Sequence, residues 1–189
     1  MSNIVENDDS NLKDHKFIVD VMLIKLGRWL RILGYDCIIP NSLNKNEIDD
    51  EKLINLAIKE KRIFLTMDKR LAENKQNVNL VLIPSSLSTV KAQILFLLNN
   101  SIIDADRLDI SELENRIKCS KCGGKLEIIK IDDLRGFLSD EEYDRIRLKY
   151  KEVWRCKNCN HIYWKGSHWN KIIQLIKDIK KELKLLNFV

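Results

Sequence analysis

The first part of the chain alternates between short apolar runs and longer segments with apolar residues at helical spacing. The apolar runs lie at residues 17–19, 35–39, 62–66 and 80–84. The segments with helical spacing lie at residues 21–34, 49–61 and 88–98, the last of them capped by Ser88. Near-continuous apolar runs are typical of parallel strands that are buried on both faces. We therefore predict an α/β fold with a mostly parallel sheet flanked by helices.

After about residue 110 the pattern changes to two more polar, hairpin-like segments at residues 118–131 and 153–164. Residues 138–150 between them are predicted to form a helix, because Ser139 and Glu142 have the spacing of a capping box. From Ser167 a last helix is expected to carry one apolar face. That face contains Ile172, Ile176, Ile179, Leu183 and Leu186. We interpret it as a surface that packs back on the sheet.

Four of the five cysteines form two Cys-x2-Cys pairs, which are Cys119 with Cys122 and Cys156 with Cys159. This spacing places two thiolates one tight turn apart, as in a zinc knuckle. Four thiolates complete a tetrahedral site, so we predict a structural zinc ion without His161 or His168 as ligands. Disulfide bonds are the alternative reading of the same pairs, and a reducing compartment argues against them.

Length and composition favour one ordinary domain or a domain with a small added module. The chain has 189 residues, of which 44% are hydrophobic and 32% are charged, enough for a packed core. No run approaches the roughly 20 apolar residues of a membrane span. The polar, acidic start matches neither a secretory signal nor a transit peptide. We therefore expect a cytoplasmic protein with a mobile tail at residues 1–15 and a buried, free thiol at Cys37.

Charge is distributed unevenly along the chain, whose net charge is +5. Residues 1–110 carry 15 Lys and Arg against 16 Asp and Glu, whereas residues 111–189 carry 18 against 12. A basic half beside a near-neutral half favours a polyanionic partner, with nucleic acid as the first candidate. The alternative is a set of ordinary solvated lysines, which would give the same count.

Three carboxylates stand at positions that the predicted sheet brings to one edge. Asp20 ends the first apolar run, Asp68 follows the third, and Asp50 (or its neighbour Asp49) starts the second predicted helix. Ligands bind in the crevice at the carboxyl ends of parallel strands. We therefore expect Asp20 and Asp68 to face each other there, with Asp50 close by.

Clustered carboxylates repel one another unless a cation neutralises them, and Mg²⁺ and Mn²⁺ prefer oxygen ligands. A divalent cation held by Asp20, Asp50 and Asp68 is therefore one reading of this edge. Asp36 and Glu47 are weaker candidates for a fourth ligand. Taken singly, each aspartate has the alternative role of a helix cap.

Four further side chains are candidates for nucleic-acid contacts: Arg28, Arg31, Lys165 and His168. The two arginines are three residues apart on a predicted helix, so they share a face that contacts phosphates or is simply solvated. The other two lie among Tyr163, Trp164 and Trp169. These aromatic rings could stack on bases, or they could pin the ribbon to the sheet domain.

The chain resembles the Mut-seven C-terminal RNase domain family, a PIN-like fold with an inserted zinc ribbon. The resemblance rests on FIVDVMLIKLGRWLRILGYD, DDEKLINLA, RIFLTMD, CSKCGG and RCKNCNHIYWKGSHW, and it covers about residues 16–172. It implies a metal-dependent ribonuclease whose acidic positions fall on Asp20, Asp50 and Asp68. The family's Arg-Trp pair falls on Arg28 and Trp29. Where the family reads Thr-Arg-Asp this chain has Thr66-Met67-Asp68, so one positive charge is missing.

These observations divide the chain into four parts: a tail (1–15), a PIN-like nuclease domain (16–112), a zinc ribbon (113–166) and a C-terminal helix (167–189). The first hypothesis is a Mg²⁺- or Mn²⁺-dependent endoribonuclease whose carboxylates bind the metal and activate water. Its ribbon would dock RNA or the ribosome. The alternative is a non-catalytic RNA- or ribosome-binding module on a degenerate nuclease fold, because a fold does not fix a function.

Overall fold

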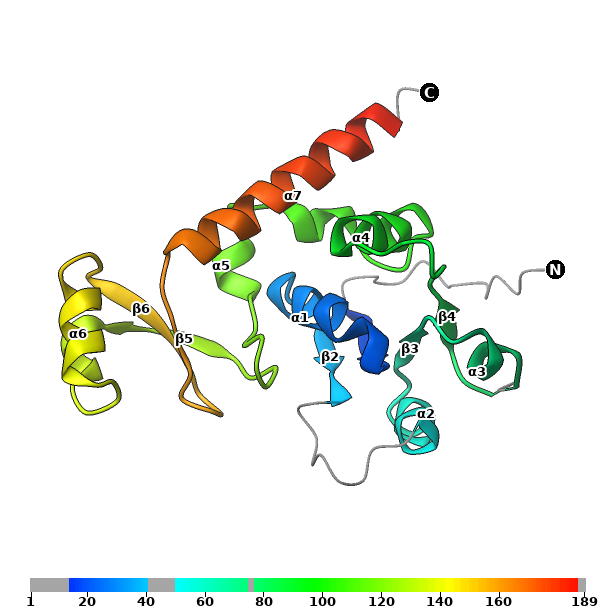
Figure 1. The fold of residues 1–189 in the computed structure, drawn as a ribbon, viewed down its shortest axis with the longest axis horizontal. Coiled ribbons are helices and arrows are strands. Elements are labelled where there is room, and N and C mark those ends of the chain that lie inside the picture. Colours follow the sequence, from blue (N-terminus) through cyan, green and yellow to red (C-terminus); the bar gives the residue numbers. More distant parts are fainter. Residues whose placement is uncertain (1–13, 41–49, 75–76, 187–189) are drawn as a thin grey trace.

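A four-stranded parallel sheet forms the centre of the first half of the chain (Figure 1). The computed structural model describes residues 14–40, 50–74 and 77–186. The strands are β1 (Lys16–Val19), β2 (Asp36–Ile38), β3 (Ile63–Thr66) and β4 (Leu80–Leu82), in the order β2-β1-β3-β4. The register pairs Phe17 with Cys37 on one side and with Ile63 on the other. The predicted parallel α/β sheet is confirmed.

Helices cover both faces of this sheet. Helices α1 (Ile24–Ile32), α4 (Val90–Asn99) and α7 (Ser167–Leu186) share one core cluster with Phe17 and Val19. Helix α2 (Asp50–Lys59) and the short α3 (Lys69–Asn74) pack on the opposite side, against Ile18 and Phe64. Alternate residues of a strand point to opposite faces, and here both faces are buried. This explains why the strands appear in the sequence as unbroken apolar runs.

The ends of the helices follow local signals in the sequence. A 3-10 turn, η2 (Val21–Leu23), precedes α1, and Gly34 follows α1 with a positive φ of 91°. Glycine adopts this left-handed conformation without a steric cost, which suits it to end a helix. Thr89 caps α4 through its hydroxyl, which accepts a hydrogen bond from the Ala92 amide at 3.2 Å. The expected cap at Ser88 is therefore wrong by one residue.

The second half begins with the short helical turns η4 (Ala105–Leu108) and α5 (Leu113–Arg116). A small antiparallel sheet follows, made of β5 (Leu126–Lys130), β6 (Glu152–Cys156) and β7 (Ile162–Tyr163) in the order β5-β6-β7. The turn η5 (Ile131–Leu134) and helix α6 (Asp140–Arg147) connect β5 to β6. The predicted capping box at the start of α6 is present, with Ser139 and Glu142 bonded reciprocally. We use the name ribbon for residues 118–164, a narrower range than the predicted 113–166.

Helix α7 leaves the ribbon and crosses the sheet part of the molecule beside α4 (Figure 1). Ile172, Ile176 and Ile179 are buried in the same core cluster as the sheet, and Leu183 packs partly against it. The side chain of Leu186 lies outside the described residues. Within the described part of the chain, none of the helices combines the length and the apolar character that crossing a membrane requires.

Candidate metal centre and candidate active site

The four paired cysteines come together in the ribbon. Their sulfur atoms all lie within 4.8 Å of one another. Cys119 Sγ is 3.6 Å from Cys159 Sγ, and Cys122 Sγ is 3.4 Å from Cys156 Sγ. Zn–S bonds of about 2.3 Å in a tetrahedron separate the sulfurs by about 3.8 Å, so the donor set fits zinc. The pairs are free thiols and not disulfides.

Both Cys-x2-Cys loops are closed by the same kind of backbone hydrogen bond, to the first cysteine from the residue four positions later. The amide of Gly123 donates to the carbonyl of Cys119 at 2.7 Å, and the amide of Asn160 donates to that of Cys156 at 2.9 Å. Gly123 and Asn160 both have positive φ, 82° and 55°, which glycine and asparagine tolerate best. The Cys122 amide also points at Cys119 Sγ, 3.4 Å away. The sequence of each knuckle therefore favours this loop conformation independently of a metal ion.

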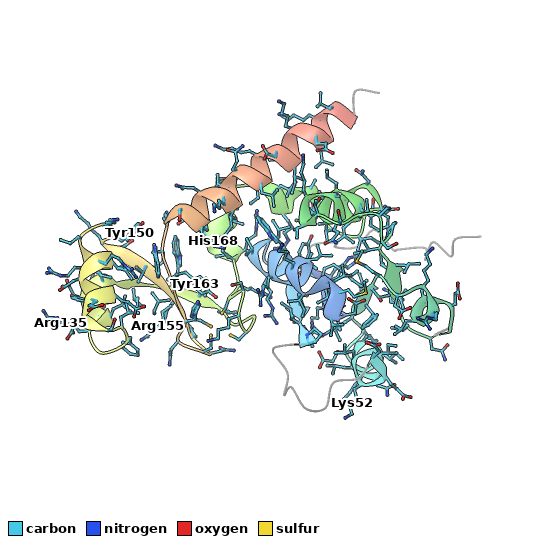
Figure 2. All side chains as sticks on the ribbon, in the orientation of Figure 1. Lys52, Arg135, Tyr150, Arg155, Tyr163 and His168 are labelled. Atoms are coloured by element: carbon cyan, nitrogen blue, oxygen red, sulfur yellow. The ribbon has the colours of Figure 1, made fainter. Side chains whose placement is uncertain are left out.

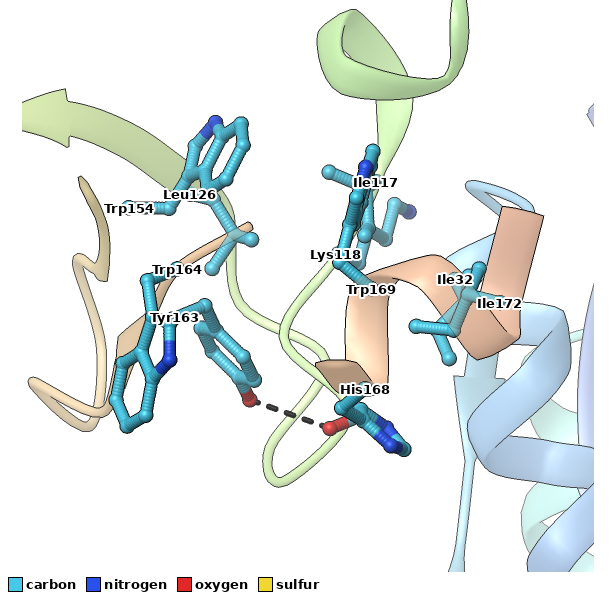
Figure 3. Close-up of a pocket in the computed structure, with 11 residues that line it drawn as sticks. Ile32, Ile117, Lys118, Leu126, Trp154, Tyr163, Trp164, His168, Trp169 and Ile172 are labelled. Atoms are coloured by element: carbon cyan, nitrogen blue, oxygen red, sulfur yellow. Dashed lines mark hydrogen bonds between the residues drawn. The ribbon is translucent and has the colours of Figure 1, made fainter. Parts of the chain in front are cut away.

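Aromatic rings join the ribbon to α7. Trp154 of β6 stacks on Trp169 of α7, with ring centroids 5.5 Å apart and planes 26° apart. Figure 3 shows these rings around a pocket that Tyr163, Trp164 and His168 also line. The pocket is apolar and small, about 50 Å³, which is room for a few water molecules at most. Trp154 and Trp169 therefore serve mainly to fix the ribbon against α7.

Asp20 lies at the carboxyl edge of the sheet, directly after β1, and it is buried, with 4% of its surface exposed. Oδ1 accepts from the Leu23 amide at 3.0 Å, so Asp20 caps η2. Oδ2 accepts from the Thr66 hydroxyl at 2.6 Å and the Met67 amide at 3.1 Å. A carboxylate offers about four acceptor positions, and these donors use three of them. Asp20 therefore caps η2 and also lies at the carboxyl edge of the sheet.

Asp68 is joined to Asp20 through Thr66. The Asp68 amide donates to Thr66 Oγ1 at 2.9 Å, and that hydroxyl donates to Asp20. Asp68 Oδ1 accepts from the Arg70 amide at 2.8 Å and more weakly from that of Leu71, so it caps α3. Thr66 was not among the predicted site residues. Its position at the last residue of a buried strand, between two edge aspartates, was the available signal.

Asp50 is the first residue of α2 and is exposed. A helix that connects two parallel strands runs antiparallel to them, so Asp50 belongs to the same edge as Asp20 and Asp68. The three carboxylates nevertheless do not converge as the thiolates do. Among residues 14–40, 50–74 and 77–186, it is the four cysteines that form a cluster of potential metal ligands. Their ligand atoms all lie within 4.8 Å of one another. Asp49 and Glu47 lie outside the described residues.

Asp36 lies at the opposite edge of the sheet, so it does not supply a fourth ligand. It is the first residue of β2 and pairs in register with Lys16, the first residue of β1. Its carboxylate faces Arg62: Nη2 donates to Oδ2 at 3.1 Å, and Nη1 lies 3.0 Å from Oδ1. Burial raises the pKa of Asp36, but Arg62 outweighs this effect, and the net pKa lies below its ordinary value. Asp36 therefore stabilises the amino edge.

The two arginines of α1 have different surroundings. Arg28 is exposed, whereas Arg31 is buried, with 2% of its surface exposed. Arg31 donates to the carbonyls of Cys37 at 2.7 Å and Ser120 at 3.2 Å. Burial lowers the pKa of Arg31, and the nearby Cys37, Cys119 and Cys122 act in the opposite direction. Arg31 is a cation between the sheet and the ribbon, which is not the surface phosphate contact that we expected.

Lys165 and His168 are exposed. Figure 2 shows His168 at the start of α7, beside the ribbon. Lys165 Nζ lies 2.7 Å from Glu114 and 5.2 Å from the centroid of the Trp154 ring. Trp164 is 39% exposed beside them. These side chains form an accessible basic and aromatic surface, although Lys165 already has an acidic partner.

The chain matches the model of the Mut7-C RNAse domain over residues 15–176. It belongs to this family. The match confirms the resemblance drawn from the motifs, and the family's name points to ribonuclease activity. A Caenorhabditis elegans protein, described as "Uncharacterized protein ZK1098.3", is 29% identical over 107 residues, which are 54% of this chain and 13% of that protein. The chain therefore spans a small part of that relative's length. No solved structure matches the chain.

Proposed function

We propose that this Mut7-C domain is a ribonuclease that hydrolyses RNA phosphodiester bonds with a divalent cation at the carboxyl edge of the sheet. The observation that carries the proposal is the linkage of Asp20, Thr66 and Asp68 at this edge. Oxygen ligands of this kind suit Mg²⁺ or Mn²⁺. Such an ion, when bound, lowers the pKa of water and offsets the charge on a scissile phosphate.

The side chains at this edge would have different roles in binding the cation. Asp20 is held rigidly by its three donors, so it would offer its remaining acceptor position in a fixed direction. Both hydrogen bonds at the Asp68 side chain go to Oδ1, which leaves Oδ2 to face a ligand. Asp50 is exposed at the start of α2 and would complete the set by a side-chain movement. A preorganised pair with one adjustable member is compatible with metal-assisted hydrolysis.

RNA would approach across the basic and aromatic surface. Arg28 on α1 and His168 at the start of α7 are exposed and suited to contact phosphates. Trp164 is partly exposed and suited to stack on an unpaired base. Such binding is expected to weaken with salt, because it releases counterions from the RNA. Arg31 has no part in it, since its guanidinium is buried.

A second candidate function is RNA or ribosome binding without catalysis. The observation that favours it is that, within the described residues, the four cysteines form a cluster that could hold a metal ion and the three carboxylates do not. Met67 also replaces the arginine that the family resemblance leads one to expect at this position. Binding without cleavage, on a fold shared with nucleases, is the outcome that would select this alternative.

The decisive experiment is cleavage of labelled single-stranded and structured RNA with Mn²⁺ by the wild type and by Asp68→Asn. Asparagine can keep the cap of α3 through its Oδ1 while it removes the charge. Asp20→Asn is less clean, because its amide would face an N–H donor at Leu23 or at Met67. We expect Asp68→Asn to cleave about 100-fold more slowly or worse, corresponding to a few kcal/mol of lost transition-state stabilisation.

Asp109→Asn is the matched control, since Asp109 also accepts a backbone amide, that of Ser111 at 3.0 Å, away from this edge. It should cleave at the wild-type rate. Calorimetric titration with Mn²⁺ should give binding to the wild type and to this control but not to Asp68→Asn. Equal cleavage by all three proteins would refute the role of Asp68. Salt-sensitive RNA binding without cleavage or Mn²⁺ binding would favour the second candidate.

A further inference from the structure

Arg31 joins the sheet to the first zinc knuckle through one side chain. Its Nε donates to the carbonyl of Cys37 in β2, and its Nη1 donates to the carbonyl of Ser120, which lies 89 residues further along the chain. The side chain of Arg31 is among the largest fully buried side chains in the described part of the protein. Both acceptors are backbone atoms, so the contacts fix main-chain positions on each side of the boundary.

The backbone of the knuckle is fitted around this guanidinium. The Lys118 amide donates to the carbonyl of Arg31 at 3.0 Å. A side-chain carbon added to Gly123 would lie 3.2 Å from Arg31 Nε, which is tighter than ordinary packing. Gly123 directly follows Cys122, one of the four thiol ligands. The cation of Arg31 therefore packs on the loop that would hold zinc.

The position of this cation suits the charge of the loaded site. Four thiolates carry more negative charge than one Zn²⁺ neutralises, and a buried cation requires negative charge near it. Where Arg31 packs on the knuckle, its positive charge would offset the excess negative charge of the zinc-bound thiolates. Those thiolates would in turn supply the negative charge that the buried guanidinium requires. Outer partners of metal ligands commonly tune metal affinity in this way.

We propose that Arg31 is a positioning residue that couples zinc binding in the ribbon to the position of strand β2. β2 is an edge strand, and the outer side of an edge strand presents unpaired carbonyl groups. Arg31 supplies the donor for one of them at Cys37, and the same guanidinium donates to the knuckle at Ser120. When zinc is lost, the knuckle loosens, Arg31 loses its acceptor at Ser120, and the edge of β2 opens.

The coupling itself stands on the cysteine cluster and on Arg31, and it does not depend on the ribonuclease proposal. Its test can therefore fail or succeed independently of whether the protein cleaves RNA.

The first test compares the zinc affinities of Arg31→Met, Arg31→Lys and the exposed control Arg28→Met by competition with a chromogenic chelator. We expect Arg31→Met to bind zinc about 10- to 100-fold more weakly. Arg31→Lys should recover part of this loss because it restores the charge without the forked hydrogen bonds. Arg28→Met should equal the wild type. A wild-type affinity in Arg31→Met would overturn the proposal.

General destabilisation is separated from coupling by Ile179→Ala, which removes core packing on α7. This variant should lower the unfolding midpoint without lowering zinc affinity. If Ile179→Ala weakens zinc binding as much as Arg31→Met does, the effect of Arg31 is ordinary loss of stability and the coupling is refuted.

A second measurement uses the wild type, so it does not depend on how the variants fold. Hydrogen exchange is followed with and without a zinc chelator. We expect the amides of residues 36–38 to lose protection at least 10-fold when zinc is removed, while those of β4 keep theirs. Unchanged exchange in β2 after complete zinc removal would overturn the proposal.

Discussion

The parallel sheet and the ribbon are stabilised in different ways. The sheet buries apolar side chains on both faces, in two clusters that include residues from five helices. The ribbon's own cluster contains six buried residues: Ile131, Leu134, Tyr143, Ile146, Val153 and Ile162. A core of this size rarely stabilises a module alone. We therefore expect the ribbon to depend on its metal site, and the sheet, apart from its edge strand β2, to be stable without it.

Removal of a zinc ligand should have the largest effect among the changes that test this difference between the ribbon and the sheet. We expect Cys119→Ser to lose zinc and to unfold the ribbon, because structural zinc sites supply on the order of 10 kcal/mol of folding free energy. Limited proteolysis should then cut within residues 118–164 while β1, β3 and β4 remain protected. Metal content by mass spectrometry of the native protein gives the corresponding stoichiometry.

Cys37→Ser is the matched control, because Cys37 is buried in the sheet and lies outside the cysteine cluster. It should keep its zinc and its resistance to protease in the ribbon. If Cys119→Ser also stays zinc-loaded and resistant, Cys119 is not a ligand and the ribbon does not need the complete cluster.

A smaller effect is expected in the core that α7 shares with the sheet. Ile179 is fully buried there, and Ile179→Ala should lower the free energy of unfolding by about 2–5 kcal/mol. Urea denaturation measures this change. Leu185→Ala on the same helix is the control, since Leu185 is 63% exposed and should change stability by less than about 0.5 kcal/mol. Equal effects at the two positions would show that α7 does not pack on the sheet in solution.

The smallest expected effect is on stability at acid pH, through the ion pair at the amino edge of the sheet. The folded-state pKa of Asp36 lies below the ordinary 3.8, since the hydrogen bonds and charge of Arg62 outweigh the effect of burial. Its contribution to stability is therefore present above about pH 4 and disappears as the pH falls through and below that value. Asp36→Asn should flatten the acid limb of a plot of unfolding midpoint against pH. An unchanged acid limb would show that the Asp36–Arg62 pair does not contribute there.

Much of the fold could be predicted from the sequence because the signals are local. The apolar runs gave each parallel strand to within one or two residues, and the Cys-x2-Cys spacing gave the metal-binding loops. The capping box at Ser139 was readable for the same reason, since its partner lies three residues away. Asp36 was also readable in principle: it begins a strand, and the beginnings of parallel strands lie opposite the edge where Asp20 and Asp68 stand.

Tertiary structure alone decided the roles of Arg28 and Arg31. Helical spacing placed both on one face, but the first knuckle packs over Arg31 and leaves Arg28 in solvent. The same holds for Trp154 and Trp169, whose stacking depends on where α7 leaves the ribbon.

The sequence by itself therefore determined the strands of the parallel sheet, the two Cys-x2-Cys loops and the family, since each is signalled by residues close together in the chain. It did not determine which cation is buried, how closely the carboxylates approach, or which aromatic rings meet. Those features depend on contacts between residues as far apart as Arg31 and Ser120. Such contacts form only after whole elements have packed, and no periodicity within either segment encodes them.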